Sequence, residues 1–106
     1  MSMLKGSERK HLRGLAHNLK PIVMIGKSGL TESVLASIDQ ALDDHELIKV
    51  KFNAFKDQKK ILSQEVTEKL KAEMVGLIGN VAIFYREHPD EDKRKISLKG
   101  KVFSEK

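Results

Sequence analysis

The sequence predicts an α/β fold: a single domain in the order α-β-α-β-α-β-β, with a four-stranded mixed sheet and packed helices. The 106 residues have the length of one domain, and 40% of them are hydrophobic, which is enough for one core. Segments with helical spacing of apolar residues alternate with short apolar runs, which favours right-handed crossovers and parallel strands at the front. Gly79-Asn80 between the last two runs indicates an antiparallel hairpin at the back.

The first helix is predicted to begin with Ser7 as its N-cap and to end near Leu19, because Lys20-Pro21 disfavours helical backbone. Its apolar positions recur at helical spacing and define a buried stripe: Leu12, Leu15, Ala16 and Leu19. The continuous apolar run 22–25 that follows is typical of a buried strand.

The second helix is predicted to run from a Thr31 N-cap to about Asp44. Residues 48–52 alternate apolar and basic side chains, which predicts a strand with one buried face and one basic face. The runs 75–78 and 81–85 form the strands of the hairpin. Before them, a third helix is predicted to continue to about Met74 on five apolar positions: Ile61, Leu62, Val66, Leu70 and Met74.

The composition excludes several kinds of chemistry. Without cysteine the chain has no disulfide, thiol nucleophile, iron–sulfur cluster or cysteine-ligated zinc. No serine-nucleophile motif or converging carboxylate pair is present, and the four histidines lack the spacing of a metal site. We therefore expect a protein that is not an enzyme and that uses no cofactor, metal or small-molecule substrate. No apolar run approaches a membrane span and no signal peptide is evident, so we expect a cytoplasmic protein without membrane association.

Charge is strongly segregated along the chain, although the net charge is only +5. Residues 1–29 carry +5, residues 30–48 carry −5 and residues 49–60 carry +4. The last segment, residues 93–106, carries +5. Segregation of this kind can place a basic face on a nearly balanced molecule, which is typical of phosphate-binding domains. The alternative is that exposed charged faces simply alternate with buried ones.

The segment Gly26-Lys27-Ser28-Gly29 is the strongest candidate for a binding loop, because it lies between a predicted strand and a capped helix. Glycine at both ends lets the backbone turn sharply, the N–H groups of the next helix favour an anion, and Lys27 adds a charge. The GXXG loop of KH domains, which clamps a nucleic-acid backbone, has this arrangement. A nucleotide P-loop is excluded because it needs glycine where Pro21 stands. An ordinary glycine turn remains the alternative.

Basic residues on either side of this segment are candidates for the same surface. Four belong to the predicted first helix and its exit, where a solvated helix face is the alternative: Arg9, Lys10, Arg13 and Lys20. Lys49 and Lys51 share one face of their strand and form either a second phosphate track or merely its exposed side.

Three stretches of the chain resemble the YhbY-type CRM (chloroplast RNA splicing and ribosome maturation) domain family. They read LRGLAH at 12–17, LKPIVMIGKSGLT at 19–31 and HELIKVK at 45–51, and the likeness continues in order to Leu98. The resemblance implies a fold similar to the C-terminal domain of translation initiation factor three. The resemblance covers residues 4–98, and we expect a CRM-type domain of residues 1–98. Residues 99–106 are then a basic C-terminal tail that we expect to be flexible.

The same resemblance implies RNA binding through the GXXG loop, carried here by Gly26, Lys27, Ser28 and Gly29. It also implies ribosomal RNA in a precursor of the large ribosomal subunit as the partner, with a role in ribosome assembly. We expect the protein to act as a monomer. Five aromatic residues are too few for a stacking platform on adjacent strands, so we expect recognition of RNA backbone and shape, although Phe55, Phe84, Tyr85 and Phe103 are candidates for base contacts.

Two other functions are compatible with the residues alone. The basic surface could bind DNA instead of RNA, because attraction to phosphate does not by itself distinguish the two. Alternatively, the chain could be a protein-interaction adaptor that uses the acidic residues of its second helix: Glu32, Asp39, Asp43 and Asp44.

Overall fold

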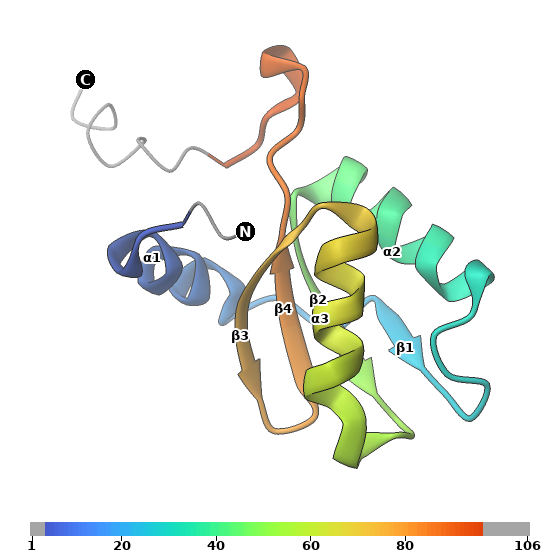
Figure 1. Cartoon of the computed structure of the whole chain (residues 1–106). Helices are drawn as coiled ribbons and strands as arrows, with labels where there is room; N and C mark the ends of the chain where they lie inside the picture. The colour runs from blue at the N-terminus through green and yellow to red at the C-terminus, as the bar shows by residue number, and fades with distance from the viewer. Residues whose placement is uncertain (1–3, 97–106) are drawn as a thin grey trace.

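The computed structural model describes residues 4–96, which contain three α-helices, four strands and two short 3-10 helices (Figure 1). The elements in chain order are α1 Gly6–Ala16, β1 Val23–Ile25, α2 Glu32–His45, β2 Leu47–Phe52, η1 Lys56–Gln58, α3 Lys59–Leu70, β3 Glu73–Ile78, β4 Val81–Tyr85 and η2 Glu91–Lys93. Helices and strands follow the predicted order. The expected tail, residues 99–106, lies outside the described residues, as do Leu98 and Phe103.

The four strands form one mixed sheet in the order β1-β2-β4-β3. β1 and β2 are parallel, whereas β4 is antiparallel to both β2 and β3. The β3–β4 turn opens with Gly79 at φ +59°, which is the conformation that a glycine-first hairpin turn requires. The α/β fold class, with parallel pairing at the front and a hairpin at the back, is therefore confirmed.

The larger core lies between one face of the sheet and the helices α2 and α3. Every second residue of β2 enters it, namely Ile48, Val50 and Phe52, and all three are buried. Ile38 and Leu42 of α2 are fully buried against them. The alternation predicted for this strand thus selects the face that α2 and α3 cover.

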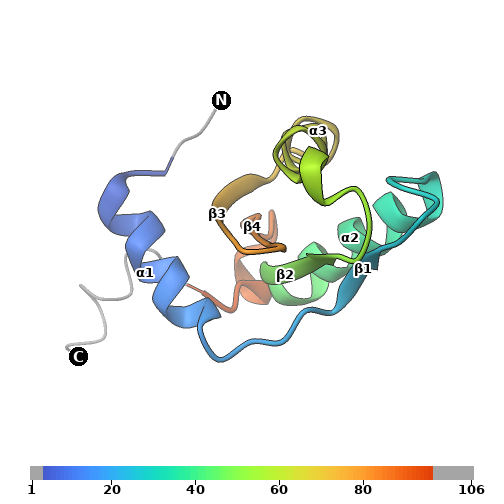
Figure 2. The same cartoon turned by 90° about the horizontal axis from the view of Figure 1, so that it is seen from below.

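A smaller core lies on the opposite face of the sheet, where α1 packs. Leu12 and Ala16 are its helical members and are fully buried, and Leu47 and Tyr85 contribute from β2 and β4. Ile96 packs against this cluster from the far end of the described chain. Figure 2 shows α1 on its own, away from α2 and α3. The single predicted core is therefore divided by the sheet into two.

The first helix differs from the prediction at both ends. Lys5 rather than Ser7 is its N-cap, because the Glu8 carboxylate accepts the Lys5 backbone N–H at 2.8 Å and closes the first turn. The helix ends at Ala16, before the predicted end at Leu19. Both predicted boundaries were therefore wrong.

Several apolar residues that were predicted to face the core are exposed: Leu15, Leu19, Ile22, Met24 and Ile61. In the 22–25 run only Ile25 is fully buried, because β1 is an edge strand and α1 packs over β2, β3 and β4 instead. A continuous apolar run does not distinguish an edge strand from a strand buried on both faces. The prediction of a buried strand was wrong for that reason.

The third helix ends at Leu70 rather than near Met74. Lys71 adopts the left-handed conformation with φ +55°, and the following Ala72 donates its N–H to Thr67 O at 3.1 Å. Met74 consequently lies in β3, paired with Phe84. The apolar spacing continued past the end of the helix because Met74, the second residue of β3, is also apolar and lies four residues after Leu70.

Candidate nucleic-acid interface

The Gly26–Gly29 segment forms a tight turn between the end of β1 and the start of α2. The Gly29 N–H donates to Gly26 O at 2.9 Å, which closes the turn and leaves Lys27 and Ser28 exposed at its tip. Gly29 is buried and has φ +78°, a conformation that an L-residue adopts only with strain. The two glycines therefore differ: the left-handed backbone of Gly29 sets the direction in which the chain leaves the turn, whereas Gly26 has open space where a side chain would be.

The helix that follows the turn begins as predicted. The Thr31 hydroxyl accepts the Val34 N–H at 3.1 Å and is the N-cap of α2. The backbone N–H groups of this first turn face the GXXG side and carry the positive end of the helix dipole. Lys27 adds a full charge a few residues away, so the tip suits an anionic group.

A second loop, formed by residues 53–58, lies directly beside the first. Asn53 N and Ala54 N both donate to Ile25 O, at 2.9 and 3.2 Å, which ties the end of β2 to the end of β1. The Phe55 ring lies against Gly29, since a Cβ placed there would be 3.4 Å from Phe55 Cε2. The two loops therefore form one continuous end of the molecule, visible at the lower right of Figure 1.

Lysines gather at this end, and we call the set Lys27, Lys51, Lys56 and Lys59 the loop-end lysines. Lys51 is exposed and pairs in register with Met24, three positions before Lys27. Lys59 Nζ donates to Gly79 O at 2.6 Å and to Asn80 Oδ1 at 3.2 Å, which ties α3 to the hairpin turn. Lys56 and Lys59 were absent from the predicted site, although the +4 charge of residues 49–60 was a signal for them.

Lys49 has a structural contact that Lys51 does not share. Its ammonium donates to Leu19 O at 3.0 Å and so holds the connection between α1 and β1 against β2. Lys51 is the nearer of the two predicted strand lysines to the GXXG turn, because it pairs with Met24, close to the end of β1. Its side chain is also more exposed than that of Lys49.

The other predicted basic residues lie away from the turn. In both views α1 is on the opposite side of the molecule from the end of β1 (Figures 1 and 2). Arg13 Nη1 donates to Val75 O at 3.4 Å, and its Cδ lies 3.2 Å from where a Gly76 Cβ would be. Arg9 Nη1 donates to Leu4 O at 3.3 Å, and Lys10 is exposed on the same helix. The structure therefore does not join these residues to the GXXG turn.

Lys20 also lies at a distance from the turn. It belongs to the connection that enters β1, at the end opposite to the one where β1 leads into Gly26. Its neighbours around a surface hollow are Leu19, Ile22 and His45. A contribution of Lys20 to the surface around the GXXG turn therefore stays a prediction.

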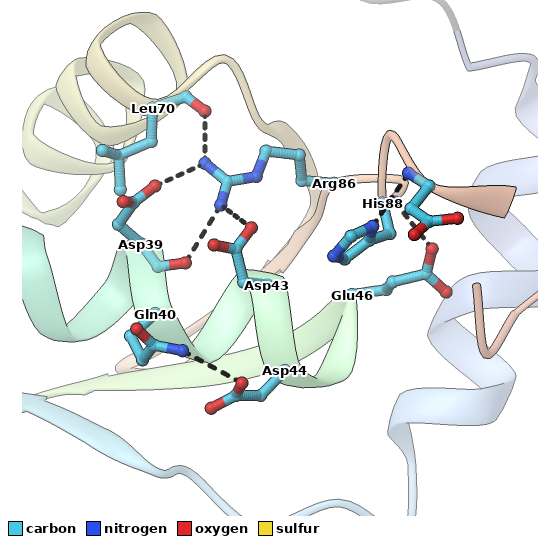
Figure 3. Close-up of polar contacts among 9 residues, drawn as sticks. Asp39, Gln40, Asp43, Asp44, Glu46, Leu70, Arg86 and His88 are labelled. Atoms are coloured by element: carbon cyan, nitrogen blue, oxygen red, sulfur yellow. Dashed lines mark hydrogen bonds and ion pairs between the residues drawn. The ribbon is translucent and has the colours of Figure 1, made fainter. Parts of the chain in front are cut away.

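Acidic residues occupy the opposite end of the sheet, around Arg86 (Figure 3). Arg86 Nη1 contacts Asp39 Oδ1 at 2.7 Å and Leu70 O at 2.8 Å, while Nη2 contacts Asp43 Oδ1 at 3.0 Å. Gln40 Nε2 donates to Asp44 Oδ1 at 3.0 Å. Three of the four acidic residues considered for an adaptor surface are thus engaged within the chain.

Glu46 is fully buried at this same end and organises the segment after β4. Its carboxylate accepts backbone N–H groups of His88, Lys95 and Ile96 at 2.8, 2.7 and 2.8 Å. Burial raises the pKa of the neighbouring Tyr85 hydroxyl well above its ordinary range, and the Glu46 charge raises it further. Glu46 and the carboxylates around Arg86 thus lie at the end of the sheet opposite to the loop-end lysines, whereas Glu32 and Asp57 lie at the GXXG end.

Within residues 4–96, no group of three or more histidine, aspartate or glutamate side chains is placed to hold a metal ion. The helices of the same segment are too short or too polar to cross a bilayer.

Comparison with known proteins places this arrangement in a family. The CRS1 / YhbY (CRM) domain matches residues 4–86. A protein of Haemophilus influenzae named "RNA-binding protein" is 43% identical over 102 residues, which cover 95% of this chain and 100% of that protein. "Probable RNA-binding protein YqeI" of Bacillus subtilis is 31% identical over 97 residues, covering 91% and 99%.

A solved structure shows the same fold. The solution structure of the hypothetical protein SAV1595 from Staphylococcus aureus has a TM-score of 0.73 and 39% sequence identity, and the match covers 90% of this chain and 100% of that one. The family match runs from the residues before α1 to the residue after β4, so it includes both cores and the GXXG turn. The chain belongs to the CRS1 / YhbY (CRM) domain family.

Proposed function

We propose that the chain is a non-catalytic RNA-binding protein that associates with ribosomal RNA in precursors of the large ribosomal subunit and assists their assembly. It acts as a monomer in the cytoplasm and contacts the RNA backbone through the GXXG turn. The observation that carries this proposal is the turn itself. Its two exposed residues lie before the capped N-terminus of α2 and beside the other loop-end lysines, at the end of the sheet opposite to the carboxylates around Arg86.

The chemistry of the turn favours a phosphodiester over other anions. Lys27 and the Ser28 hydroxyl can bind separate oxygens of one phosphate. The N–H groups at the start of α2 add dipolar attraction, and the one carboxylate in that first turn is Glu32. Lys51 lies on β2 and Lys56 in the loop after it, beside the turn, where neighbouring phosphates of the same RNA strand would pass. The names of the relatives agree with this ligand class.

The first test compares two charge reversals at exposed lysines, Lys27→Glu and Lys10→Glu. Both change the net charge equally, but Lys10 lies on α1, away from the turn. We expect Lys27→Glu to weaken binding to large-subunit ribosomal RNA by about 10-fold or more, as for a charged contact, with an unchanged unfolding temperature. Lys10→Glu should weaken it far less. Equal losses would show that only overall charge matters and would contradict the turn as the site.

The salt dependence of binding gives an independent count of phosphates. If three loop-end lysines each contact one phosphate of a single strand, the log–log slope of affinity against salt should be about −2. Lys27→Glu should reduce the magnitude of this slope by roughly 0.7. A wild-type slope near zero would exclude both RNA and DNA. Tighter binding to duplex DNA than to ribosomal RNA at matched salt would favour the DNA function.

The assembly role is tested by sedimentation of a gentle lysate. Wild-type protein should travel with large-subunit precursors, whereas Lys27→Glu should remain at the top of the gradient. Wild-type protein found only at the top at low salt would overturn the ribosomal part of the proposal. In that case binding to a purified basic ribosomal protein after nuclease treatment would identify an adaptor.

A further inference from the structure

Phe55 is the one exposed aromatic residue among residues 4–96. The other three, Phe52, Phe84 and Tyr85, are almost wholly buried in the two cores and are unavailable to a ligand. Phe55 is 41% exposed, although it is a large apolar side chain that lies among lysines at one end of the domain. Neither core uses its ring.

The backbone holds Phe55 in an unusual conformation. Its φ of +56° and ψ of +38° are left-handed, which is an outlier for a bulky residue. Hydrogen bonds fix the loop on either side: Ala54 N donates to Ile25 O at 3.2 Å, and Gln58 N donates to Phe55 O at 2.9 Å. The backbone that carries the ring is therefore held in one place at the surface.

The Phe55 ring lies beside the GXXG turn. A Cβ added at Gly29 would lie 3.4 Å from Phe55 Cε2, so a ligand phosphate at Lys27 and Ser28 would have the ring nearby. Beside the ring is a shallow hollow of about 500 Å³, lined by residues 54–58, which include the charged side chains of Lys56 and Asp57. An aromatic surface next to a cation and an anion-binding turn suits a nucleotide, which has a flat base and a phosphate.

We propose that Phe55 is a base-stacking subsite of this interface, which receives one unpaired base of a single-stranded RNA segment whose backbone lies on the GXXG turn. The inference rests on the proposed RNA-binding function and adds to it a ligand class. Bases in a duplex are already stacked on their neighbours, so the subsite selects loops, bulges and ends over continuous helix. One ring admits one base, which gives little sequence preference because every base has an aromatic face.

The test uses the full chain and two probes of defined chemistry. One is a 12-nucleotide single-stranded oligouridine with a central 2-aminopurine, and the other is a 12-base-pair RNA duplex. Stacking on the ring should change 2-aminopurine fluorescence when wild-type protein binds. Phe55→Leu should abolish this change and weaken single-strand binding by about 5-fold or more, which corresponds to at least ~1 kcal/mol for one stacked base.

Two variants separate stacking from support of the turn. Phe55→Trp keeps an aromatic face and should retain both the affinity and the fluorescence change. Leu15→Ala removes an apolar side chain of similar exposure, 43%, on α1 and should alter neither. The unfolding temperature of each variant reports whether its fold is intact.

Three results would overturn the inference. Single-strand binding that depends on Lys27 but is unchanged in Phe55→Leu would remove the subsite and leave the proposed function standing. Equal losses of single-strand and duplex binding in Phe55→Leu would mean that the ring only supports the turn. Failure of wild-type protein to bind either probe at low salt would remove both the subsite and the RNA-binding function.

Discussion

Alanine at Gly29 should destabilise the domain, whereas alanine at Gly26, in the same turn, should not. Gly29 has φ +78°, where a Cβ meets its own backbone, and the φ of Gly26 lies outside the left-handed range. A Cβ at Gly26 would have no neighbour within 4 Å. The pair therefore isolates backbone conformation, because the change in side chain is the same.

The expected difference follows from two known effects. Placing an L-residue in the left-handed region costs about 1–2 kcal/mol at Gly29. The new Cβ would be 3.4 Å from the Phe55 ring, an ordinary contact that adds little. At Gly26, alanine restricts the unfolded chain and contributes about 0.4–1 kcal/mol of stability. The two variants should differ by about 2 kcal/mol, or roughly 10 °C in unfolding temperature.

Urea and thermal unfolding followed by circular dichroism measure this difference directly. Gly29→Ala should also weaken RNA binding, because relief of the backbone strain moves the turn. Gly26→Ala tests whether the RNA backbone must come close to the protein backbone at Gly26. Unfolding temperatures that agree within 2–3 °C, about 0.5 kcal/mol, would refute the argument. The left-handed conformation of Gly29 would then not be required by the fold.

Three further changes test the acidic end and the cores. Glu46→Gln should cost about 2–4 kcal/mol in urea unfolding, because an amide nitrogen replaces one oxygen that accepts a backbone N–H in a buried site. Since burial raises the Tyr85 pKa above its ordinary 10.0, the unfolded chain releases this proton first, and stability should fall as pH rises above 10. Tyr85→Phe should remove that part of the loss. Ser63→Ala should stabilise α3 by about 1 kcal/mol, because the Ser63 hydroxyl is buried without a partner.

Each of these three substitutions has a control or a result that would contradict its prediction. Glu87→Gln changes an exposed carboxylate that lies 3.7 Å from Arg94 and should alter stability by less than about 0.5 kcal/mol. An equal effect at Glu46 would contradict its role in holding the segment after β4. Identical alkaline stability curves for Tyr85→Phe and wild type would contradict the burial of the hydroxyl. Destabilisation by Ser63→Ala would reveal a hydrogen bond to that side chain.

Much of the fold was accessible from local patterns in the sequence. The Thr31 cap, the alternation of residues 48–52 and the Gly79-Asn80 turn each depend on neighbouring residues only, and all three are present as predicted. Helix ends were less accessible. Lys5 replaced Ser7 as a cap because a glutamate lay three residues further on, and Lys71 ended α3 through a left-handed backbone that apolar spacing does not register.

The candidate site was predictable only in part. The GXXG turn was found because its four residues are consecutive and flanked by a strand and a capped helix. Lys56 and Lys59 join it through the pairing of β2 with β1, and Phe55 joins it through contact with Gly29. These neighbours are more than 20 residues apart in the chain, so no local pattern connects them.

The sequence by itself determined the order of helices and strands, the family likeness and the turn, because periodicity, caps and short motifs are properties of adjacent residues. Tertiary structure alone decided which charges share a surface. Arg13 bonds to Val75 O and Lys49 to Leu19 O, while Asp39 and Asp43 are held by Arg86, and each of these pairs is distant in the chain. Packing of the two cores brings such residues together, and it leaves the loop-end lysines and Phe55 at the surface beside the GXXG turn.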